Sequence, residues 1–387
     1  MRKFAPVLNR HELNRWTYRR ANVSFRSILL IHGCKPESDL NGHVIQKTMI
    51  KRAFSFWSKE NKPNITNEGT DNFPVKSYNI ISPTHNKLPD QQISLPSYIN
   101  RPEYANSSEA FTPSIDDPLK IWNEDEIRYI RKSCQLAKRV LRSLADIIFS
   151  YGEGSFGRQS TESTKYANLG QSSILTTDEL NRKAQEMIIS NNAYPSTLNF
   201  KGFPKSIATS VNNVAAHGIP DDRPLELGDI LTIDVTVYHD GFHGDCSETY
   251  VFGGVCDPDA CHLISSAKEC LFGGISACAP GAPLRSIGSA ISKLSKRRGL
   301  TVIPPLCGHG IGTFFHMAPD IYHCVNNYPG VMKPGMIFTI EPCITEGFPG
   351  VDVWSDGFSI ATRDHSRTAQ FEHTVLITEK GVDILTL

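Results

Sequence analysis

The sequence predicts an α+β fold made of two similar halves, and three patterns support this prediction. Four segments carry helix signals in their capping residues, their apolar spacing or their basic C-terminal ends. Another segment alternates between two faces with the period of a half-buried strand and continues into a hairpin signal. The order helix, helix, strand, strand occurs twice, and the two halves carry the similar tetrapeptides His217-Gly-Ile-Pro and His309-Gly-Ile-Gly. A duplicated α+β unit follows from this order.

Composition excludes several classes of protein. The chain has 387 residues, of which 40% are hydrophobic, so it can bury a substantial core. Its 40 basic and 40 acidic residues cancel, so we expect no nucleic-acid partner. No apolar run approaches the roughly 20 residues of a membrane helix, so we expect no membrane partner either. The ten cysteines form no Cys-x-x-Cys pair and are too sparse for a disulfide scaffold. The oligomeric state stays unknown.

The N-terminal region divides into two segments ahead of the main domain. Residues 1–37 are predicted to be a transit peptide, because the first thirty residues hold seven basic side chains and a single acid, Glu12. This predicts a mitochondrial location, with another organelle or the cytoplasm as the alternative if the segment is only a disordered basic tail. Residues 38–112 are polar, rich in Asn, Pro and Ser, and predicted to be a linker or extended segment. The folded domain is expected to span 113–387.

The domain begins with two predicted helices. Asn123 and Glu126 form a capping-box pattern. Apolar residues then follow at helical spacing, at Ile130, Cys134, Ala137, Leu141, Leu144 and Ile148. Residues 151–171 are polar and Gly-rich and are predicted to be a surface insertion. Thr176 and Glu179 mark the start of a second helix.

A β-hairpin is predicted next. Residues 230–238 alternate between two faces, and Asp240-Gly241 is a hairpin turn signal that leads into a second strand at about 242–252. A two-residue turn places residue 234 opposite 247 and residue 236 opposite 245. Asp234 and Asp245 would then be diagonal neighbours on one face, whereas a longer turn or a bulge would break this register.

The second half repeats this order. Helices are predicted around 261–276 and 286–299, and three strand-like runs follow around His309, at 337–344 and at 370–377. The last two runs contain Glu341 and Glu372 in apolar surroundings. Each acid therefore resembles Asp234 in lying on a strand that faces a core.

These acids suggest a metal centre. A buried carboxylate needs a partner, and a single one is more often capped by backbone or paired with Arg. Four carboxylates with one imidazole would be balanced by two divalent cations. The candidate ligands are Asp234, Asp245, His309, Glu341 and Glu372. Oxygen-dominated ligation suits Co, Mn, Fe or Zn without choosing among them, and two such metals can activate water for amide hydrolysis.

Seven motifs occur in the order found in one enzyme family. They are Gly202-Phe-Pro-Lys-Ser206, Ala216-His-Gly-Ile-Pro220, Ile233-Asp-Val-Thr236, Gly241-Phe-His-Gly-Asp245, Gly308-His-Gly-Ile-Gly312, Phe338-Thr-Ile-Glu-Pro342 and Gln370-Phe-Glu-His373. From about Pro96 to the C-terminus the chain resembles the methionine aminopeptidases, and its Arg-rich start resembles the organellar type I branch. The 31 positions from Glu341 to Glu372 are too few for the helical insertion of type II enzymes.

The resemblance implies a pita-bread fold, in which two pseudo-symmetric halves surround a central antiparallel sheet and enclose two divalent metal ions. Asp234 would bind one metal with both oxygens. Asp245 and Glu372 would bridge the pair, and His309 and Glu341 would complete the other site.

The resemblance also implies the catalytic residues and the substrate. Glu341 matches the family's proton shuttle, His217 the histidine at the scissile nitrogen and His316 the one that stabilises the oxyanion. The substrates would be the N-termini of nascent polypeptides with a small second residue, from which the initiator methionine is hydrolysed. The methionine pocket and the substrate contacts would comprise His217, His316, Thr197, Phe200, Phe203, Phe315 and Phe358.

Four pocket positions depart from the family pattern, and two rival functions are open. Thr197, Ala208 and Ala216 stand where cysteines are common in the family, and Phe358 stands where tryptophan is common. One rival is a proline-directed pita-bread peptidase, which shares the ligands but usually has a large folded N-terminal domain. The other is a catalytically inactive pita-bread binding protein, a class that usually loses ligands.

Overall fold

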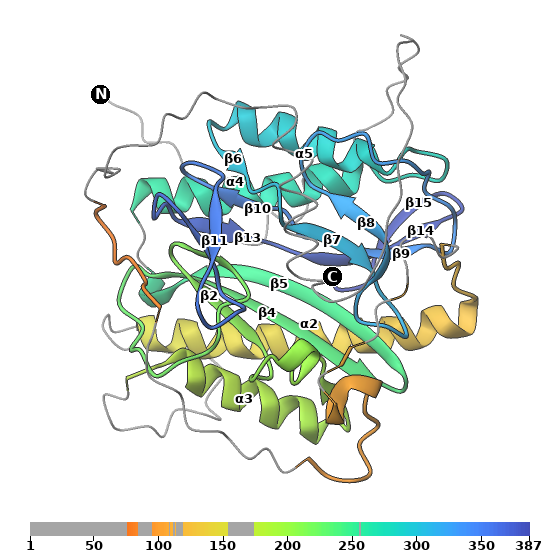
Figure 1. Cartoon of the computed structure of the whole chain (residues 1–387), viewed down its shortest axis with the longest axis horizontal. Helices are drawn as coiled ribbons and strands as arrows, with labels where there is room; N and C mark the ends of the chain where they lie inside the picture. The colour runs from red at the N-terminus through yellow and green to blue at the C-terminus, as the bar shows by residue number, and fades with distance from the viewer. Residues whose placement is uncertain are drawn as a thin grey trace, which may run out of the picture. The chain divides into compact units, whose positions relative to one another are not determined.

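The computed structural model describes residues 76–83, 95–107, 109–110, 113, 119–153, 174–254 and 257–387 (Figure 1). The predicted transit peptide at 1–37 lies outside these ranges, as do much of the 38–112 segment and all but the first three residues of the 151–171 insertion. The described residues fall within one compact unit, Gln46–Leu387.

Two helices open the first half, and both begin as the sequence predicts. Helix α2 (Glu124–Glu153) starts with reciprocal bonds, in which Asn123 Oδ1 accepts from the Glu126 amide at 3.0 Å and Glu126 Oε2 accepts from the Asn123 amide at 2.9 Å. Helix α3 (Thr177–Ser190) is capped by the Thr176 side chain, which accepts from the Glu179 amide. All six apolar residues predicted for the inner face of α2 are buried.

The strands of the first half follow α3. They are β1 (Tyr194–Pro195), β2 (Ala208–Val211), β3 (Val214–Ala216), β4 (Ile230–His239) and β5 (Phe242–Val251), with short 3-10 helices η1 (Glu103–Asn106), η2 (Phe200–Gly202) and η3 (Phe252–Gly254) around them. Strand β4 pairs with β1 and β2 along one edge and with β5 along the other.

The second half repeats the helix pair and then adds ten strands. The helices are α4 (Pro258–Ser276) and α5 (Arg285–Arg297). The strands are β6 (Thr301–Val302), β7 (Cys307–Gly310), β8 (Met317–Tyr322), β9 (Ile337–Ile340), β10 (Cys343–Thr345), β11 (Val351–Val353), β12 (Ile360–Thr362), β13 (Thr368–Gln370), β14 (His373–Thr378) and β15 (Gly381–Ile384).

The prediction of three strand runs in this half is wrong in detail. The run at 337–344 is two strands, β9 and β10, and the run at 370–377 is divided between β13 and β14. The first break falls at Glu341-Pro342, where proline cannot donate to a ladder, and the second falls at Phe371-Glu372. The strands on either side of the breaks belong to two sheets, ordered β15-β14-β9-β7-β8 and β13-β10-β6.

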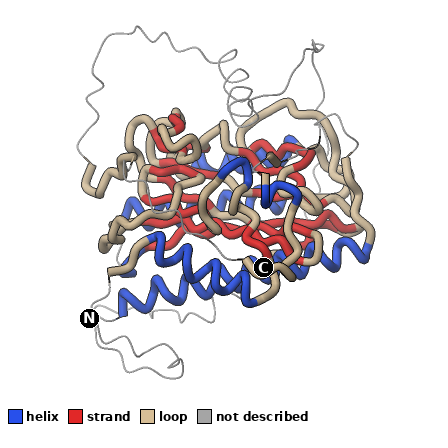
Figure 2. Tube along the Cα trace, turned by 60° about the horizontal axis from the view of Figure 1, so that its bottom comes forward, coloured by secondary structure: helices blue, strands red, loops and turns tan. Residues whose placement is uncertain are grey.

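Helices cover the strands on both sides. In Figure 1, α2 and α3 lie below β4 and β5, whereas α4 and α5 lie above the strands of the second half, and Figure 2 shows the strands between the helices. Each half has its own apolar core, one between α2, α3 and the β4–β5 hairpin and one between α4, α5 and strands such as β9 and β14. A fourth sheet, β11-β12-β3, joins the halves because β12 of the second half pairs with β3 of the first.

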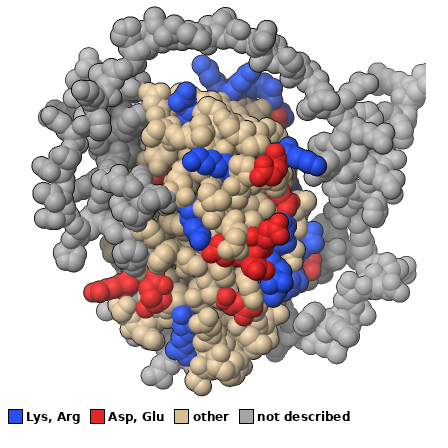
Figure 3. Space-filling view, turned by 90° about the vertical axis from the view of Figure 1, so that its right-hand side faces the viewer, with Lys and Arg blue, Asp and Glu red and all other residues tan. Residues whose placement is uncertain are grey.

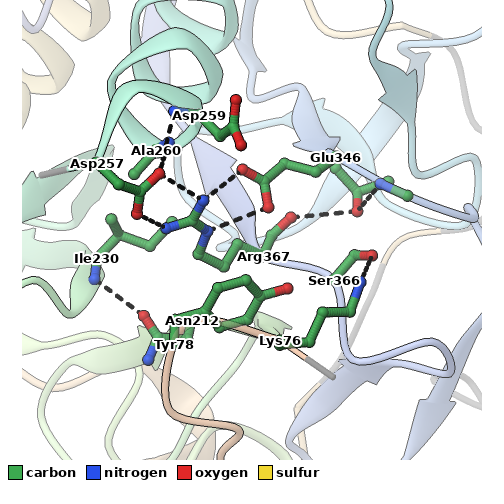
Figure 4. A network of polar contacts seen from close by, with 12 residues as sticks. Lys76, Tyr78, Asn212, Ile230, Asp257, Asp259, Ala260, Glu346, Ser366 and Arg367 are labelled. Carbon is green, nitrogen blue, oxygen red and sulfur yellow. Dashed lines mark hydrogen bonds and ion pairs between the residues drawn. The ribbon is translucent and has the colours of Figure 1, made fainter. Parts of the chain in front are cut away.

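The described part of the 38–112 segment contacts the domain at specific places. Arg367 forms ion pairs with Asp257, the N-cap of α4, and with Glu346, at 2.5 and 2.8 Å (Figure 4). The Tyr78 ring covers this guanidinium at 4.4 Å, and the pairing holds the pKa of Asp257 down at about 2. Residues 76–83 therefore pack on an ionic network that is centred on the buried Arg367 and links α4 to the end of β10.

The described residues have mixed surface charges and mostly free cysteines. On the face drawn in Figure 3, acidic and basic side chains are intermixed over much of the surface. None of the helices in the described ranges has the length and apolarity that a membrane crossing requires. Seven cysteines in these ranges are free thiols, and Cys261 is disulfide-bonded.

Candidate metal centre and active site

The β4–β5 hairpin places two aspartates side by side, in the register predicted from the sequence. Asp234 pairs with Ser247 and Thr236 pairs with Asp245. The turn residues Asp240 and Gly241 both have positive φ, 52° and 91°, as a two-residue turn of type I′ requires. The odd-numbered residues of β4 pack in the core between the hairpin and helices α2 and α3. The even-numbered face of the strand, which carries Asp234, therefore points away from these helices.

Both carboxyl groups are buried with little to neutralise them. Burial raises the pKa of Asp234 to about 6, and burial together with the Asp234 charge raises the pKa of Asp245. Thr236 donates a 2.7 Å hydrogen bond to Asp245 Oδ1, whereas Asp234 Oδ1 has no hydrogen-bond partner among the described residues. Such an unsatisfied buried oxygen is costly unless a cation accompanies it.

His309 reaches the same point from β7. Its neighbours Gly308 and Gly310 are required by space, because a Cβ at either position would collide with the backbone oxygen of Thr339 or Ala318. The His309 Nδ1 lies 3.1 Å from the Gly310 carbonyl oxygen, so Nδ1 carries the proton and Nε2 presents a lone pair. Nε2 lies 3.9 Å from Asp245 Oδ2 and 3.7 Å from Glu341 Oε1.

Glu341 and Glu372 come from the two breaks between strands. The breaks face each other, because Ile340 pairs with His373 on one side and Cys343 with Gln370 on the other. Because neither glutamate belongs to a strand, both side chains can point toward the β4–β5 hairpin. Burial raises the pKa of Glu341 to about 8, and burial with the charges of neighbouring acids raises that of Glu372.

The acids and His309 form one cluster whose chemistry fits divalent cations. Ligand atoms of Asp245, His309 and Glu372 all lie within 4.8 Å of one another. Glu341 lies next to this group, because its Oε1 is near His309 Nε2. Glu372 Oε1, like Asp234 Oδ1, is buried without a hydrogen-bond partner in the described part of the chain. Four converging carboxylates and one unprotonated imidazole nitrogen form a donor set that divalent metals accept.

His217 and His316 flank the cluster. His217 follows β3 with a left-handed backbone, φ 55°, and its Nδ1 is buried without a hydrogen-bond partner in the described ranges. The His316 ring centroid lies 3.9 Å from that of His309. Burial lowers the pKa of His217 to about 4, and burial and the proximity of His309 lower that of His316, so both rings are neutral near pH 7.

Every site residue predicted from the sequence lines one cavity of about 130 Å³. Its apolar wall is built from phenyl rings in edge or tilted contact, with Phe200 4.7 Å from Phe315 and Phe203 5.3 Å from Phe358 between centroids. Thr197 turns its hydroxyl away to donate to the Lys205 carbonyl oxygen at 3.1 Å. The departures at 197, 208, 216 and 358 therefore leave the lining largely apolar.

The structure adds residues that the sequence analysis did not single out. Thr339 accepts a hydrogen bond from the His309 amide and donates one to Glu341 Oε1 at 2.8 Å. His323 Nε2 accepts from the Glu341 amide at 3.1 Å, and the Gln370 side chain donates to Glu341 Oε2 at 3.3 Å. The motif strings Phe-Thr-Ile-Glu and Gln-Phe-Glu contained Thr339 and Gln370, but spacing alone gave them no role. Lys201 also lines the cavity.

Comparison with known proteins finds similarity to metallopeptidases. The profile of metallopeptidase family M24 matches residues 128–379. The chain is 43% identical to the Homo sapiens protein named methionine aminopeptidase 1D, mitochondrial, over 76% of this chain and 79% of that protein. It is 38% identical to the Mus musculus protein of the same name, over 93% and 96%. The crystal structure of methionine aminopeptidase from Rickettsia prowazekii is 37% identical and superposes with a TM-score of 0.62, covering 70% of this chain and all of that one.

These similarities confirm the predicted pita-bread fold and the predicted class of enzyme, a metal-dependent hydrolase. They also agree with the mitochondrial type expected from the sequence, since both named relatives carry that designation. The chain belongs to metallopeptidase family M24 and, within that family, to the methionine aminopeptidases of the mitochondrial type.

Proposed function

We propose that this chain hydrolyses the initiator methionine from polypeptides with a small second residue, in mitochondria, using two divalent cations. The observation that carries the proposal is that four carboxyl groups and His309 line one cavity together with phenyl rings, with ligand atoms of Asp245, His309 and Glu372 within 4.8 Å of one another. The family membership supports the chemistry, and the relatives' names support the location.

The residues that would hold the cations are Asp234, Asp245, His309, Glu341 and Glu372, with Asp245 and Glu372 between the two ions. When bound, divalent cations at this place supply an activated water and a polarised carbonyl for amide hydrolysis. Mn, Fe, Co and Zn all suit this donor set.

Glu341 is proposed to move the proton. It is held from both sides, by the Thr339 hydroxyl on Oε1 and the Gln370 amide on Oε2, so its carboxyl group keeps one orientation. A carboxyl group held in one orientation can accept a proton from water and pass it to the leaving group.

The two histidines are proposed to contact the reacting amide. A neutral imidazole can donate one hydrogen bond, so His217 can meet the nitrogen of the leaving amide and His316 can donate to the developing oxyanion. Burial keeps both rings neutral at pH 7, so neither ring repels the bound cations.

The remaining wall is proposed to select methionine. Thr197, Phe200, Phe203, Phe315 and Phe358 surround a narrow apolar space that suits an unbranched thioether, because sulfur packs well against aromatic rings. The carboxylate cluster beside this space attracts the substrate's α-amine, which only the first residue of a polypeptide carries. Cleavage is therefore expected at the N-terminal peptide bond.

The proposal is tested with purified protein stripped of metal and then given Mn or Co. We expect methionine release from Met-Ala-Ser and little from acetyl-Met-Ala-Ser, whose amine is blocked. Cleavage of Xaa-Pro peptides in preference to Met-Ala-Ser would instead identify a proline-directed peptidase. Absence of turnover with every divalent metal tried would identify an inactive binding protein.

We also propose the domain boundaries expected from the sequence. Residues 1–37 act as the transit peptide, 38–112 as an extended segment and 113–387 as the catalytic domain. Fusion of residues 1–37 to a reporter protein should direct it into mitochondria, and a diffuse cytosolic signal would refute the transit peptide. A fusion in which the basic residues of this segment are replaced by Gln is the control.

A further inference from the structure

Lys201 lines the cavity, but the proposed function assigns it no role. Among the described residues that line the cavity, it alone is a lysine or arginine, and it shares that lining with five acids. Those acids are Asp234, Asp245, Asp320, Glu341 and Glu372. A cation next to a proposed cation site does not help to hold metal, so its presence calls for another explanation.

The position of Lys201 is fixed by the backbone. Both Lys201 and Asn199 adopt the left-handed region, with φ of 52° and 61°, which side-chain-bearing residues rarely do. Asn199 is tied to the preceding segment because its Nδ2 donates to the carbonyl oxygens of Tyr104 and Ala105 at 3.2 and 3.0 Å. The lysine ammonium then lies 5.0 Å from the Phe200 ring centroid, inside the cavity wall.

The ammonium has no hydrogen bond or ion pair with the described part of the protein. The contrast with Lys205, four residues later, is clear, since Lys205 Nζ lies 2.6 Å from Asp178 Oδ1. Partial burial also lowers the pKa of Lys201, because its ammonium is less hydrated than on an open surface. A partly desolvated ammonium without a counter-ion is stabilised when another molecule supplies one.

The side of the cavity that Lys201 serves follows from its neighbours. The ammonium lies over the Phe200 ring, whose centroid is 5.0 Å from that of His316, and its charge contributes to the lowered pKa of His217, so Lys201 lies on the side of the cavity that holds these two histidines. The proposed function places His217 at the nitrogen of the leaving amide. Lys201 is therefore near the substrate residues that follow the scissile bond, on the leaving-group side.

We propose that Lys201 is a specificity-determining residue that binds a carboxylate carried by the substrate downstream of the scissile bond. This inference rests on the proposed function and adds a charge preference to it. The carboxylate is either an acidic side chain at the third or fourth residue or the C-terminus of a short peptide. A basic side chain at the same place would be repelled by Lys201.

The test compares peptides that differ in one charge. Metal-loaded full-length protein is given Met-Ala-X-Gly-Tyr-amide and Met-Ala-Gly-X-Tyr-amide, with X as Asp, Asn or Lys. At one of the two positions we expect kcat/KM for Asp to exceed that for Lys by about tenfold, mainly through KM, because charge-assisted hydrogen bonds in partly buried sites are strong. The ratio should fall as salt is added. A ratio within about twofold at both positions would overturn the inference.

Substitutions of Lys201 test whether its charge causes the preference for acidic peptides. Lys201→Glu should reverse the preference so that the Lys peptides are cleaved faster, and Lys201→Arg should keep the wild-type order. Lys201→Met should bring the Asp-to-Lys ratio close to one, with folding checked by thermal unfolding. Lys293→Met, on the exposed face of α5, is the matched control and should keep the full ratio. An unchanged ratio in Lys201→Met would refute the role of this residue.

One further comparison identifies the source of the carboxylate. Met-Ala-Gly with a free C-terminus and its amide distinguish a terminal carboxylate from an acidic side chain, because only the free acid carries the former. Failure of the charge preference is also distinguishable from failure of the proposed function. Equal cleavage of all peptides removes the inference and leaves the enzyme, whereas no cleavage of any peptide removes the proposed function.

Discussion

Asp245 lies one step along the β4–β5 ladder from Asp234, diagonally across the hairpin and on the same face. The two carboxyl groups are therefore anionic neighbours, and each has a raised pKa. Repulsion between the two carboxylates destabilises the metal-free protein, whereas both charges stabilise a bound cation. Removing one carboxylate should therefore have opposite effects on the stability of the metal-free protein and on metal binding.

Asp245→Asn should weaken metal binding by orders of magnitude and abolish methionine release, because it removes a charge and an oxygen ligand from the proposed bridge. The same change should leave the metal-free protein at least as stable as wild type, since one of two repelling carboxylates is gone. Metal titration by calorimetry and thermal unfolding with chelator measure the two effects.

Asp240→Asn, in the turn of the same hairpin, is the control for this change. Asn tolerates the left-handed backbone at this position, φ 52°, so both metal binding and activity should be retained. Wild-type metal affinity in Asp245→Asn would contradict the bridging role.

The pH dependence of the metal-free protein follows from the same acids. Asp234 and Glu341 have folded-state pKa values raised to about 6 and about 8, above the 3.9 and 4.3 typical of unfolded chains. Between these limits the unfolded state releases protons that the folded state retains, so the free energy of unfolding falls as pH rises from about 4 to about 8. Saturating metal should flatten this dependence, because it favours the ionised carboxylates in the folded state.

Thermal unfolding from pH 5 to 8, with chelator and with Mn, measures this difference. At a metal concentration 100 times its Kd, the stabilisation should reach about 2.7 kcal/mol. A metal-free protein whose melting temperature is constant over this range would show that the acids are not held protonated.

Thr339→Val should loosen metal binding without touching a proposed ligand. The Thr339 hydroxyl accepts from the His309 amide and donates to Glu341, so its loss frees two ligands at once. Changes to groups that orient ligands typically cost about 10- to 100-fold in metal affinity or activity. Thr345→Val is matched, because its buried hydroxyl also bonds to backbone but lies on β10, where it donates to the Arg367 carbonyl oxygen. Equal losses of metal affinity in the two variants would mean that Thr339 acts only through stability.

The sequence predicted which residues line the cavity better than it predicted the strands that carry them. Period-two alternation and a two-residue turn were sufficient to place Asp234 and Asp245, because hairpin register is a local property. Glu341 and Glu372 were identified within their motifs, but their positions in breaks between two sheets were not predicted. Those breaks depend on contacts between segments far apart in the chain, which periodicity does not report.

The residues that hold the ligands were missed for a related reason. Thr339, His323 and Gln370 are ordinary strand or loop residues whose role appears only when Glu341 is brought beside them. Lys201 was likewise not singled out, although it directly precedes the motif Gly202–Ser206, because a lysine beside a glycine is normally a solvated turn residue. Its place in the cavity lining and the lack of a hydrogen-bond or ion-pair partner in the described structure distinguish it.

The segment before the matched family profile should affect substrate binding as well as stability. Tyr104, 1% exposed, donates a 2.6 Å hydrogen bond to the Ser196 carbonyl oxygen, and its ring meets the Phe200 ring edge-on at 5.0 Å. Phe200 lines the proposed methionine pocket, so the segment at 95–107 supports the pocket from behind. Tyr104→Phe leaves the Ser196 carbonyl without its donor, which should cost about 1 to 3 kcal/mol in the free energy of unfolding.

Tyr104→Ala, which also removes the ring behind Phe200, should raise KM for Met-Ala-Ser more than Tyr104→Phe does, because Phe200 then loses its support. Tyr98→Ala is the control within the same segment, since that side chain is 72% exposed and should affect neither stability nor KM. Denaturant unfolding and steady-state kinetics on the three variants separate the two effects. If Tyr104→Ala lowers stability but leaves KM at the wild-type value, the segment stabilises the domain without shaping the pocket, and the methionine site is complete within the part of the chain that the family profile matches.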